Sequence, residues 1–384
     1  MKRVSDFFRG TEKGTRKPAF DRTLFITAAA LAVLGSIAVF SAGGPYAEFR
    51  YGDENFFIKR QVLWLAIGII TMLAASHVPV ATYRKITPYL YFATIVLLVL
   101  TLLVGLVGNG AQRWLKIGPI TVQPSEIAKM TVVMMLALYF SKKEELHLLR
   151  TRKRILLNDT LYPIAIMLVP IILVMLQKHL SCIIILGSIG LLVIVASGND
   201  ARYIRLFTLI GIATVIALAL FTDYTKDRIT VWLDPESYKL TGGWQTLQGL
   251  MAIGSGGIFG VGFGNSLLKY CYVSEPANDM IFAIVCEEMG FIGAVFTLSV
   301  FAFLIYRGYS LAIKQTDTFA RLLIFGITTK IALQTLLNVG VVTNTIPNTG
   351  ISLPFFSYGG SSLIMICFEI GMVLAFSRYS KIEK

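Results

Sequence analysis

Charged residues are scarce in this chain of 384 residues. Asp, Glu, Lys and Arg together make up 15% of the sequence, whereas a soluble globular domain carries about a quarter. Hydrophobic residues make up 55%, which is far too many for a disordered chain. The composition therefore excludes an ordinary soluble enzyme and favours one polytopic membrane protein.

Cysteine and histidine are also few, and their spacing suits no metal site. The four cysteines show no C-x-x-C spacing, and the three histidines are scattered along the chain. We therefore expect neither a metal site built from these residues nor a disulfide framework. The cysteines are Cys182, Cys271, Cys286 and Cys367, and the histidines are His77, His147 and His179.

The net charge is +13, which in a soluble protein would suggest a nucleic-acid partner. Membrane proteins, however, collect Lys and Arg in their cytoplasmic loops. That explanation fits the composition better, so we expect no nucleic-acid partner.

Ten apolar runs are long enough to cross a bilayer, which takes roughly 17–25 residues. The first run is longer than the apolar part of a typical signal peptide, so we interpret it as a span. The sequence therefore predicts an all-α membrane protein with ten transmembrane helices. The runs lie at about 22–41, 60–79, 87–107, 123–141, 160–177, 181–197, 203–221, 280–306, 321–343 and 361–377.

The basic residues predict the orientation of the spans. Lys and Arg are concentrated in the segments that would be cytoplasmic if the N-terminus lay inside. Both tails, 1–21 and 380–384, are then cytoplasmic, and 22–379 forms one membrane domain. Segment 222–279 becomes a large extracytoplasmic loop. Loops of that length are usually functional or linkers, and the tryptophans and glycines of this one are unlike a linker, so we expect the chemistry on the outer face.

Ionisable residues near the outer ends of the spans are candidates for function, because charge is costly to bury in lipid. Glu126 and Lys129 lie three residues apart and share one helix face; a functional site and a structural ion pair both explain that spacing. Asp279 stands where the long loop enters the eighth span. There it could act as a general base with a raised pKa, or equally cap the helix.

Four further ionisable residues lie deeper in the predicted spans. Glu287, Glu288, Lys330 and Glu369 each stand about 12–14 Å from a helix end at 1.5 Å per residue. One lysine among three carboxylates predicts a single buried polar cluster. A proton relay in a transporter is the alternative explanation.

Two glycine-rich segments also stand out. GSGGIFGVGFG (254–264) lacks the spacing of nucleotide-binding loops, so flexible backbone and close helix approach explain it better. LPFFSYGGSS (353–362) precedes the tenth span and is irregular. Such backbone within a membrane must be buried in protein or line a wet cavity, which predicts a cavity near Asp279 and Glu126.

Four longer motifs resemble those of the shape, elongation, division and sporulation (SEDS) family, and the resemblance covers nearly the whole chain. Their wording is closer to the FtsW and SpoVE branches than to the RodA branch. The motifs are GAQRWLKIGPITVQPSEIAK (110–129), WLDP with GGWQTLQGLMAIGSGGIFGVGFGNS (232–266), EPANDMIFAIVCEEMGFIG (275–293) and NTGISLPFFSYGGSS (348–362).

The resemblance implies a peptidoglycan glycosyltransferase that polymerises lipid II on the outer face of the bacterial cytoplasmic membrane. It implies a class B penicillin-binding protein as partner transpeptidase, within the membrane machinery of division or elongation. It also implies that Asp279 is the catalytic carboxylate. The residues expected to line its cavity are Arg113, Trp114, Gln123, Glu126, Lys129, Lys269, Ser357 and Tyr358. Taken alone, Trp114 would be an interfacial anchor.

The sequence departs from the family pattern at three places. Ser274 replaces a usual proline, and Met280 stands where phenylalanine is common. His179 stands where the family has an acidic residue, so we assign no role to that short loop.

The reaction that the family implies converts an α-linked sugar diphosphate into a β-1,4 glycan, and therefore inverts the reacting carbon. One general base suffices for a single displacement, without the close carboxylate pair of a retaining glycosidase. The leaving diphosphate would be held by a divalent cation such as Mg or Mn, or by basic side chains. The candidates are Arg113, Lys129, Arg228 and Lys269.

Two other functions remain open from the residues alone. A lipid II flippase would use the deep carboxylates and would tolerate the loss of Asp279. A non-catalytic scaffold would tolerate substitutions in the cavity and depend on its lipid-facing helix surfaces.

Overall fold

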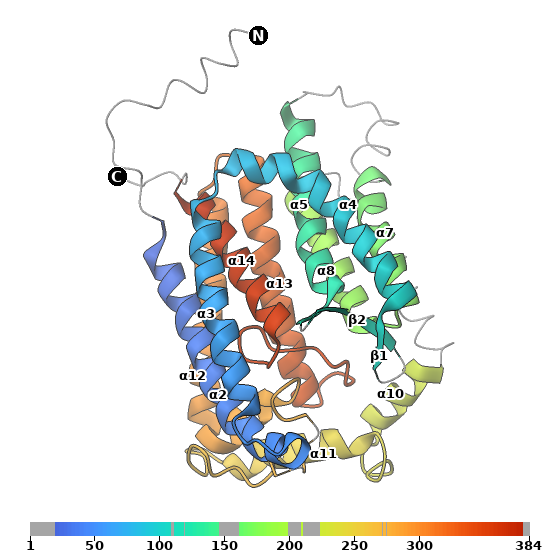
Figure 1. Cartoon of the computed structure of the whole chain (residues 1–384), viewed down its shortest axis with the longest axis vertical. Coiled ribbons are helices and arrows are strands. Elements are labelled where there is room, and N and C mark those ends of the chain that lie inside the picture. Colours follow the sequence, from blue (N-terminus) through green and yellow to red (C-terminus); the bar gives the residue numbers. More distant parts are fainter. Residues whose placement is uncertain are drawn as a thin grey trace.

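The computed structural model describes residues 20–108, 111–118, 120–145, 161–198, 209, 223–270, 272–273 and 275–378. Within these ranges the chain forms a bundle of long helices (Figure 1). The long helices are α2 (Arg22–Tyr51), α3 (Phe56–His77), α4 (Val80–Val104), α5 (Pro124–Glu145), α7 (Tyr162–Leu176), α8 (Leu180–Ala196), α12 (Ile281–Ile313), α13 (Thr318–Val342) and α14 (Gly360–Ser377). Two further helices, α10 (Asp223–Leu233) and α11 (Gly243–Gly256), lie in the predicted outer loop.

Nine of the ten predicted spans coincide with these long helices. Six of the helices in the described ranges are long and apolar enough to cross a membrane, and α7 and α8 are apolar but shorter. The protein is therefore a multi-pass membrane protein. The seventh predicted span, 203–221, lies outside the described residues apart from residue 209, so the total of ten helices stays a prediction.

A small antiparallel sheet was not predicted from the sequence. Its strands are β1 (Leu106–Gly108), β2 (Ala111–Ile117) and β3 (Ile120–Val122), in the order β1-β2-β3. The connection between α4 and α5 carries Gly105, Gly108, Gly110 and Pro119, which disfavour a helix. The chain turns back at Gly118, whose φ is 62°. The expectation of an all-α chain therefore needs this correction.

The bundle has two distinct ends. At one, called the terminal end here, the backbone N–H of Asp21 donates to Ser377 Oγ at 3.0 Å, so the described chain begins and finishes side by side. Arg307 forms an ion pair with Asp21 there, at 2.5 Å. At the opposite end, called the loop end here, lie the sheet, α10 and α11 (Figure 1). The candidate site is built at the loop end.

Helix α12 is interrupted within its length. Gly290 has φ 66° and ψ −166°, which are not helical angles. Its outer part, Ile281 to Met289, begins two residues after Asp279 and carries Glu287 and Glu288. The interruption separates this outer part from the rest of α12.

A candidate active site at the loop end

Asp279 precedes α12 and does not cap it. The N-cap position is held by Met280, which makes no side-chain capping bond. The carboxylate of Asp279 instead accepts from Gln245 Nε2 of α11, at 3.3 Å to Oδ1 and 3.2 Å to Oδ2. The helix-cap explanation for this residue is therefore wrong.

The surroundings of Asp279 favour its protonated form. Burial raises the pKa of Asp279 to about 6, and the negative charge of Glu275 acts in the same direction. The amide of Gln245 and the charge of Arg228 oppose this shift without cancelling it. A carboxyl with a pKa near 6 is deprotonated at neutral pH and is still basic enough to accept a proton.

The irregular segment before α14 holds the backbone around Asp279 in place. Ser357 Oγ donates to the carbonyl of Asn278 at 2.7 Å. The N–H of Tyr358 donates to the carbonyl of Ala277 at 2.8 Å. Segment 348–359 therefore holds the backbone of the two residues before Asp279.

Two further side chains tie this region to neighbouring helices. Asn338 of α13 donates from Nδ2 to the carbonyl of Asp279 at 2.8 Å and to that of Ile351 at 2.7 Å. Arg228 of α10 donates to the carbonyl of Asn348. Helix α13 thus contacts both segments that form the site, and α10 contacts segment 348–359.

A buried charge network joins α5, α13 and α14. Lys129 Nζ lies 2.6 Å from Glu126 Oε1. Lys330 Nζ lies 3.9 Å from Glu126 Oε2 and 2.7 Å from Glu369 Oε1. All four side chains are at most a tenth exposed. Two ammonium groups and two carboxylates balance each other, as buried charges must.

A cavity lies between this network and segment 348–359. It is small, with a volume of about 20 Å³, and its walls come from both the charge network and the segment. The lining residues are Glu126, Lys330, Gln334, Ser352, Leu353, Pro354, Phe355, Ser357, Ser362, Leu363 and Ile366. Ser357 connects the two halves of the site, because it lines the cavity and also bonds to Asn278 beside Asp279. The cavity was expected near both Asp279 and Glu126; Glu126 and Ser357 line it, whereas Asp279 is not among its lining residues.

The predicted site residues on the sheet side lie around the start of α5. Gln123 accepts from the N–H of Glu126 at 3.0 Å through its carbonyl. Arg113 of β2 donates from Nη2 to the carbonyl of Lys178 at 2.7 Å, while its Nε is buried without a hydrogen-bond partner among the described residues. Trp114 is 37% exposed at the loop end.

His179, in the short loop left without a role, lies beside the same helix start. Its Nδ1 is 3.3 Å from Ser125 Oγ. Burial lowers the pKa of His179 to about 3, and the charges of Arg113 and Lys129 act in the same direction. The ring is therefore neutral, so where the family has an acidic residue this chain places no charge.

Lys269 and Tyr358 are placed differently from the rest. The ring of Tyr358 packs edge-on against Phe57, with centroids 4.7 Å apart. Lys269 is 4% exposed, and its ammonium group pairs with Glu288 at 3.1 Å. The ammonium group of Lys269 therefore belongs to a separate cluster, in which Glu288 is its ion-pair partner.

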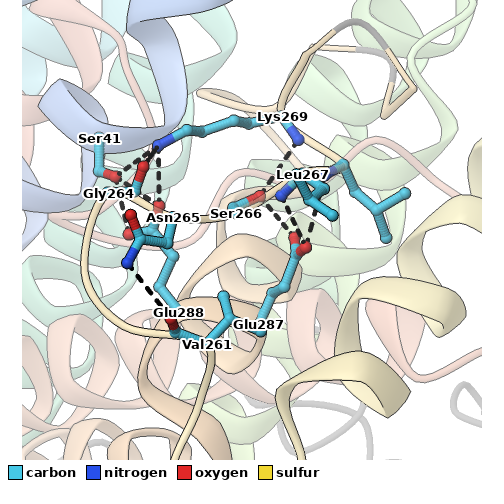
Figure 2. Close-up of polar contacts among 10 residues, drawn as sticks. Ser41, Val261, Gly264, Asn265, Ser266, Leu267, Lys269, Glu287 and Glu288 are labelled. Atoms are coloured by element: carbon cyan, nitrogen blue, oxygen red, sulfur yellow. Dashed lines mark hydrogen bonds and ion pairs between the residues drawn. The ribbon is translucent and has the colours of Figure 1, made fainter.

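The single deep cluster expected from the sequence does not exist. Glu369 pairs with Lys330, as expected. Glu287 and Glu288, however, bind Ser266 and Lys269 in the separate cluster that Figure 2 shows. Depth along a helix does not define which way a side chain points, and these two glutamates point toward the outer loop.

Sequence reasoning missed Gln245 and Asn338, which both contact Asp279. Asn338 is a polar residue within a predicted span, which was a usable signal. Gln245 lies inside a family motif, but only the fold of the outer loop brings it to Asp279. No group of three or more His, Cys, Asp and Glu side chains in the described ranges is arranged to hold a metal ion. No step proposed below depends on a metal held by the protein.

Comparison with known proteins identifies the family of this chain. Residues 21–382 match the family described as cell cycle protein, whose label names FtsW, RodA and SpoVE. The chain belongs to this family. It is 37% identical over 370 residues to stage V sporulation protein E of Bacillus subtilis, covering 96% of this chain and 99% of that protein. It is 36% identical over 370 residues to a probable peptidoglycan glycosyltransferase FtsW of Saccharophagus degradans, covering 95% and 93%.

Solved structures from the same family share the fold. A chain from a study titled "Structural coordination of polymerization and crosslinking by a peptidoglycan synthase complex" superposes with a TM-score of 0.78 at 26% identity, covering 94% of this chain and 99% of that one. The rod shape determining protein RodA of Thermus thermophilus superposes with a TM-score of 0.70 at 26% identity, covering 95% and 99%.

Proposed function

We propose that this protein is a peptidoglycan glycosyltransferase that polymerises lipid II on the outer face of the bacterial cytoplasmic membrane. The observation that carries the proposal is Asp279, a partly buried carboxylate with a raised pKa, held at the loop end by two family motifs. Relatives named as peptidoglycan glycosyltransferases that align with nearly the whole chain support it.

Asp279 acts as the general base in this proposal. It accepts the proton from the 4-hydroxyl of the acceptor sugar as that oxygen attacks the anomeric carbon of the donor. The bond from that carbon to the diphosphate breaks, and undecaprenyl diphosphate leaves. The carbon inverts from the α to the β configuration, which needs only one displacement and one base.

In this proposal, Arg113 and Arg228 stabilise the leaving diphosphate. Arg113 has a buried Nε without a partner in the described structure, which leaves a donor for an anion. Arg228 is close enough to lower the pKa of Asp279 through its charge. Lys129 is left out of this group because its ammonium is buried against Glu126. We leave Lys269 out of this group because its ammonium is buried against Glu288. A divalent cation could accompany the diphosphate itself.

The remaining predicted cavity residues shape the site. In this proposal, Glu126 keeps Lys129 and Lys330 in place through its two oxygens. Trp114 and Gln123 offer a ring and an amide to the sugars, and Ser357 and Tyr358 hold the backbone behind Asp279.

A partner transpeptidase fits the same proposal. One matching solved chain comes from work on a peptidoglycan synthase complex that coordinates polymerization and crosslinking. We therefore expect a class B penicillin-binding protein to crosslink the strands made here, within a division or elongation complex.

The direct test is polymerisation by the purified protein. Protein in detergent or liposomes is given lipid II, alone and with a class B penicillin-binding protein, and the glycan chains are separated on a gel. Formation of long chains that a muramidase digests supports the proposal. Transport of lipid II across liposomes without any polymer would favour a flippase, and neither activity would favour a scaffold.

The pH dependence of polymerisation should show the raised pKa of Asp279. The base must be deprotonated, so kcat/KM should rise with pH through about 6 and then level off. A carboxyl with an ordinary pKa would give a plateau that extends well below pH 5. A rate independent of pH between 5 and 7 would contradict this prediction.

Substitution of two neighbours of Asp279 should move the acid limb of the profile, which is the rise of kcat/KM through about pH 6, in opposite directions. Glu275 raises the pKa of Asp279 by its negative charge, so Glu275→Gln should shift the limb to lower pH. Gln245 lowers this pKa by donating to the carboxylate, so Gln245→Leu should shift the limb to higher pH. Profiles of kcat/KM for both variants, measured beside the unaltered protein, check the directions. Two shifts in the same direction would show that another group controls the limb.

A further inference from the structure

The glycine-rich segment 257–264 fills the interruption in α12. An uninterrupted helix would pair the carbonyls of Glu287 and Glu288 with the N–H groups of residues 291 and 292. Here these carbonyls and these N–H groups form hydrogen bonds with the backbone of the glycine-rich segment instead. The bonds run from Val261 N to Glu287 O at 3.0 Å, Gly262 N to Glu288 O at 3.0 Å, Phe291 N to Gly257 O at 2.9 Å and Ile292 N to Ile258 O at 3.2 Å.

Only glycine permits this exchange at its closest points. A Cβ atom on Gly260 would lie 2.2 Å from the carbonyl oxygen of Glu288. A Cβ atom on Gly290 would lie 2.3 Å from the backbone nitrogen of Gly260, and φ at Gly290 is positive. Two glycines therefore allow backbone-to-backbone contact in the middle of a membrane helix.

The side chains of Glu287 and Glu288 reinforce this contact between α12 and the loop (Figure 2). Glu287 accepts from Ser266 Oγ at 2.5 Å and from the N–H of Leu267 at 3.0 Å. Glu288 accepts from Ser41 Oγ of α2 at 2.6 Å and pairs with Lys269 Nζ at 3.1 Å. Adjacent glutamates thus bind the turn of the outer loop and α2 at the same time.

Lys269 completes this cluster. Its ammonium group also donates to the carbonyl of Gly264 at 2.7 Å and lies 3.3 Å from Ser41 Oγ. Lys269 and Glu288 are each 4% exposed. Their charges neutralise each other away from water, and removing either one would leave the other buried and unpaired.

We propose that Lys269 and Glu288 are positioning residues that hold Asp279 in its active orientation. The proposal rests on the proposed glycosyltransferase function. Because α12 is interrupted at Gly290, the rest of the helix does not fix its outer part, Ile281 to Met289, through continuous backbone bonds. The Lys269–Glu288 pair, called the clip here, ties this outer part to the loop and, through Ser41, to α2. The outer part begins two residues after Asp279, so a change in its orientation moves the backbone that carries the base.

Loss of the clip should lower turnover more than substrate binding. In Lys269→Met and in Glu288→Gln, kcat per folded molecule should fall by about 10–100-fold, because small misplacement of a reacting group has effects of that order. KM for lipid II should change far less. The acid limb of the rate should also move to lower pH, because a displaced Asp279 is more exposed to water.

A milder variant, a control variant and a double variant distinguish a loss of positioning from simple misfolding. Ser41→Ala removes one donor to Glu288 and should give a smaller fall in kcat with the same direction of the pH shift. Asp21→Asn removes an ion pair with Arg307 at the terminal end, so it should lower thermal stability without moving kcat or the acid limb. The double variant Lys269→Met/Glu288→Gln should recover stability relative to the single variants but not turnover.

Each result has a separate meaning. If the unaltered protein polymerises lipid II and the clip variants keep full kcat per folded molecule with an unmoved acid limb, the clip has only a structural role and the proposal is overturned. If the unaltered protein makes no glycan, the proposed function itself fails. A fall in kcat with a moved limb, absent in Asp21→Asn, supports the clip.

Discussion

Replacement of Asp279 by asparagine should abolish glycan polymerisation while leaving the protein folded. Asparagine keeps the shape of the side chain and its contact with Gln245, but it accepts no proton at neutral pH. Loss of a general base typically lowers the rate by about 10²–10⁴-fold. The measurement is the rate of chain growth from lipid II by purified protein, normalised to the amount of folded protein.

A matched control uses an aspartate of the same outer loop. Asp227 of α10 is exposed, so Asp227→Asn makes the same chemical change outside the site and should retain the full rate. The hydrogen bonds from Tyr358 and Asn338 go to backbone carbonyls at Ala277 and Asp279 and not to the carboxylate, so the Asp279→Asn protein should keep them and fold normally. Full polymerisation by Asp279→Asn, at normal protein levels, would remove Asp279 from the role of base.

Replacement of Lys330 by methionine should cause the largest loss of stability. Lys330 pairs with Glu369 at 2.7 Å and lies 3.9 Å from Glu126, inside the bundle. Its removal leaves the carboxylate of Glu369, which is 0% exposed, without its partner. Breaking a buried ion pair from one side costs about 3–5 kcal/mol. Thermal unfolding in detergent should therefore show a strongly lowered Tm.

Removing both charges of that pair should reverse much of the loss. In Lys330→Met/Glu369→Gln, the charges left in this network are those of Glu126 and Lys129, which pair with each other. The double variant should therefore melt above the single one. Lys226→Met, at an exposed position of α10, is the control and should leave Tm nearly unchanged. Equal Tm values for the single variant and the unaltered protein would show that the pair contributes little.

Long apolar runs made most of the fold predictable. In lipid, backbone groups must be satisfied within the segment, so an apolar run of sufficient length has to form a helix. That is why nine predicted spans match helices. The sheet at 106–122 was not predicted because its strands are three to seven residues long and are paired by a turn. Strands of that length carry little periodicity.

The sequence by itself suggested candidate residues for the site, but it missed Gln245 and Asn338 and did not give the grouping of the others. Glu126 and Lys129 share a helix face because of the helical period, so their ion pair followed from spacing. Glu287, Glu288, Lys330 and Glu369 could be placed at a depth only. Whether each one faced a neighbouring helix or the outer loop depended on helix rotation and on the interruption at Gly290.

The amino-acid order thus determined a membrane-embedded helical protein with a carboxylate where its long loop meets the bundle. Tertiary structure alone decided that Lys330 joins Glu126, that Lys269 joins Glu288, and that Gln245 reaches Asp279. The physical reason is the range of the forces involved. Hydrophobicity and helical period act along one segment, whereas a buried charge chooses its partner only after packing has brought distant segments together.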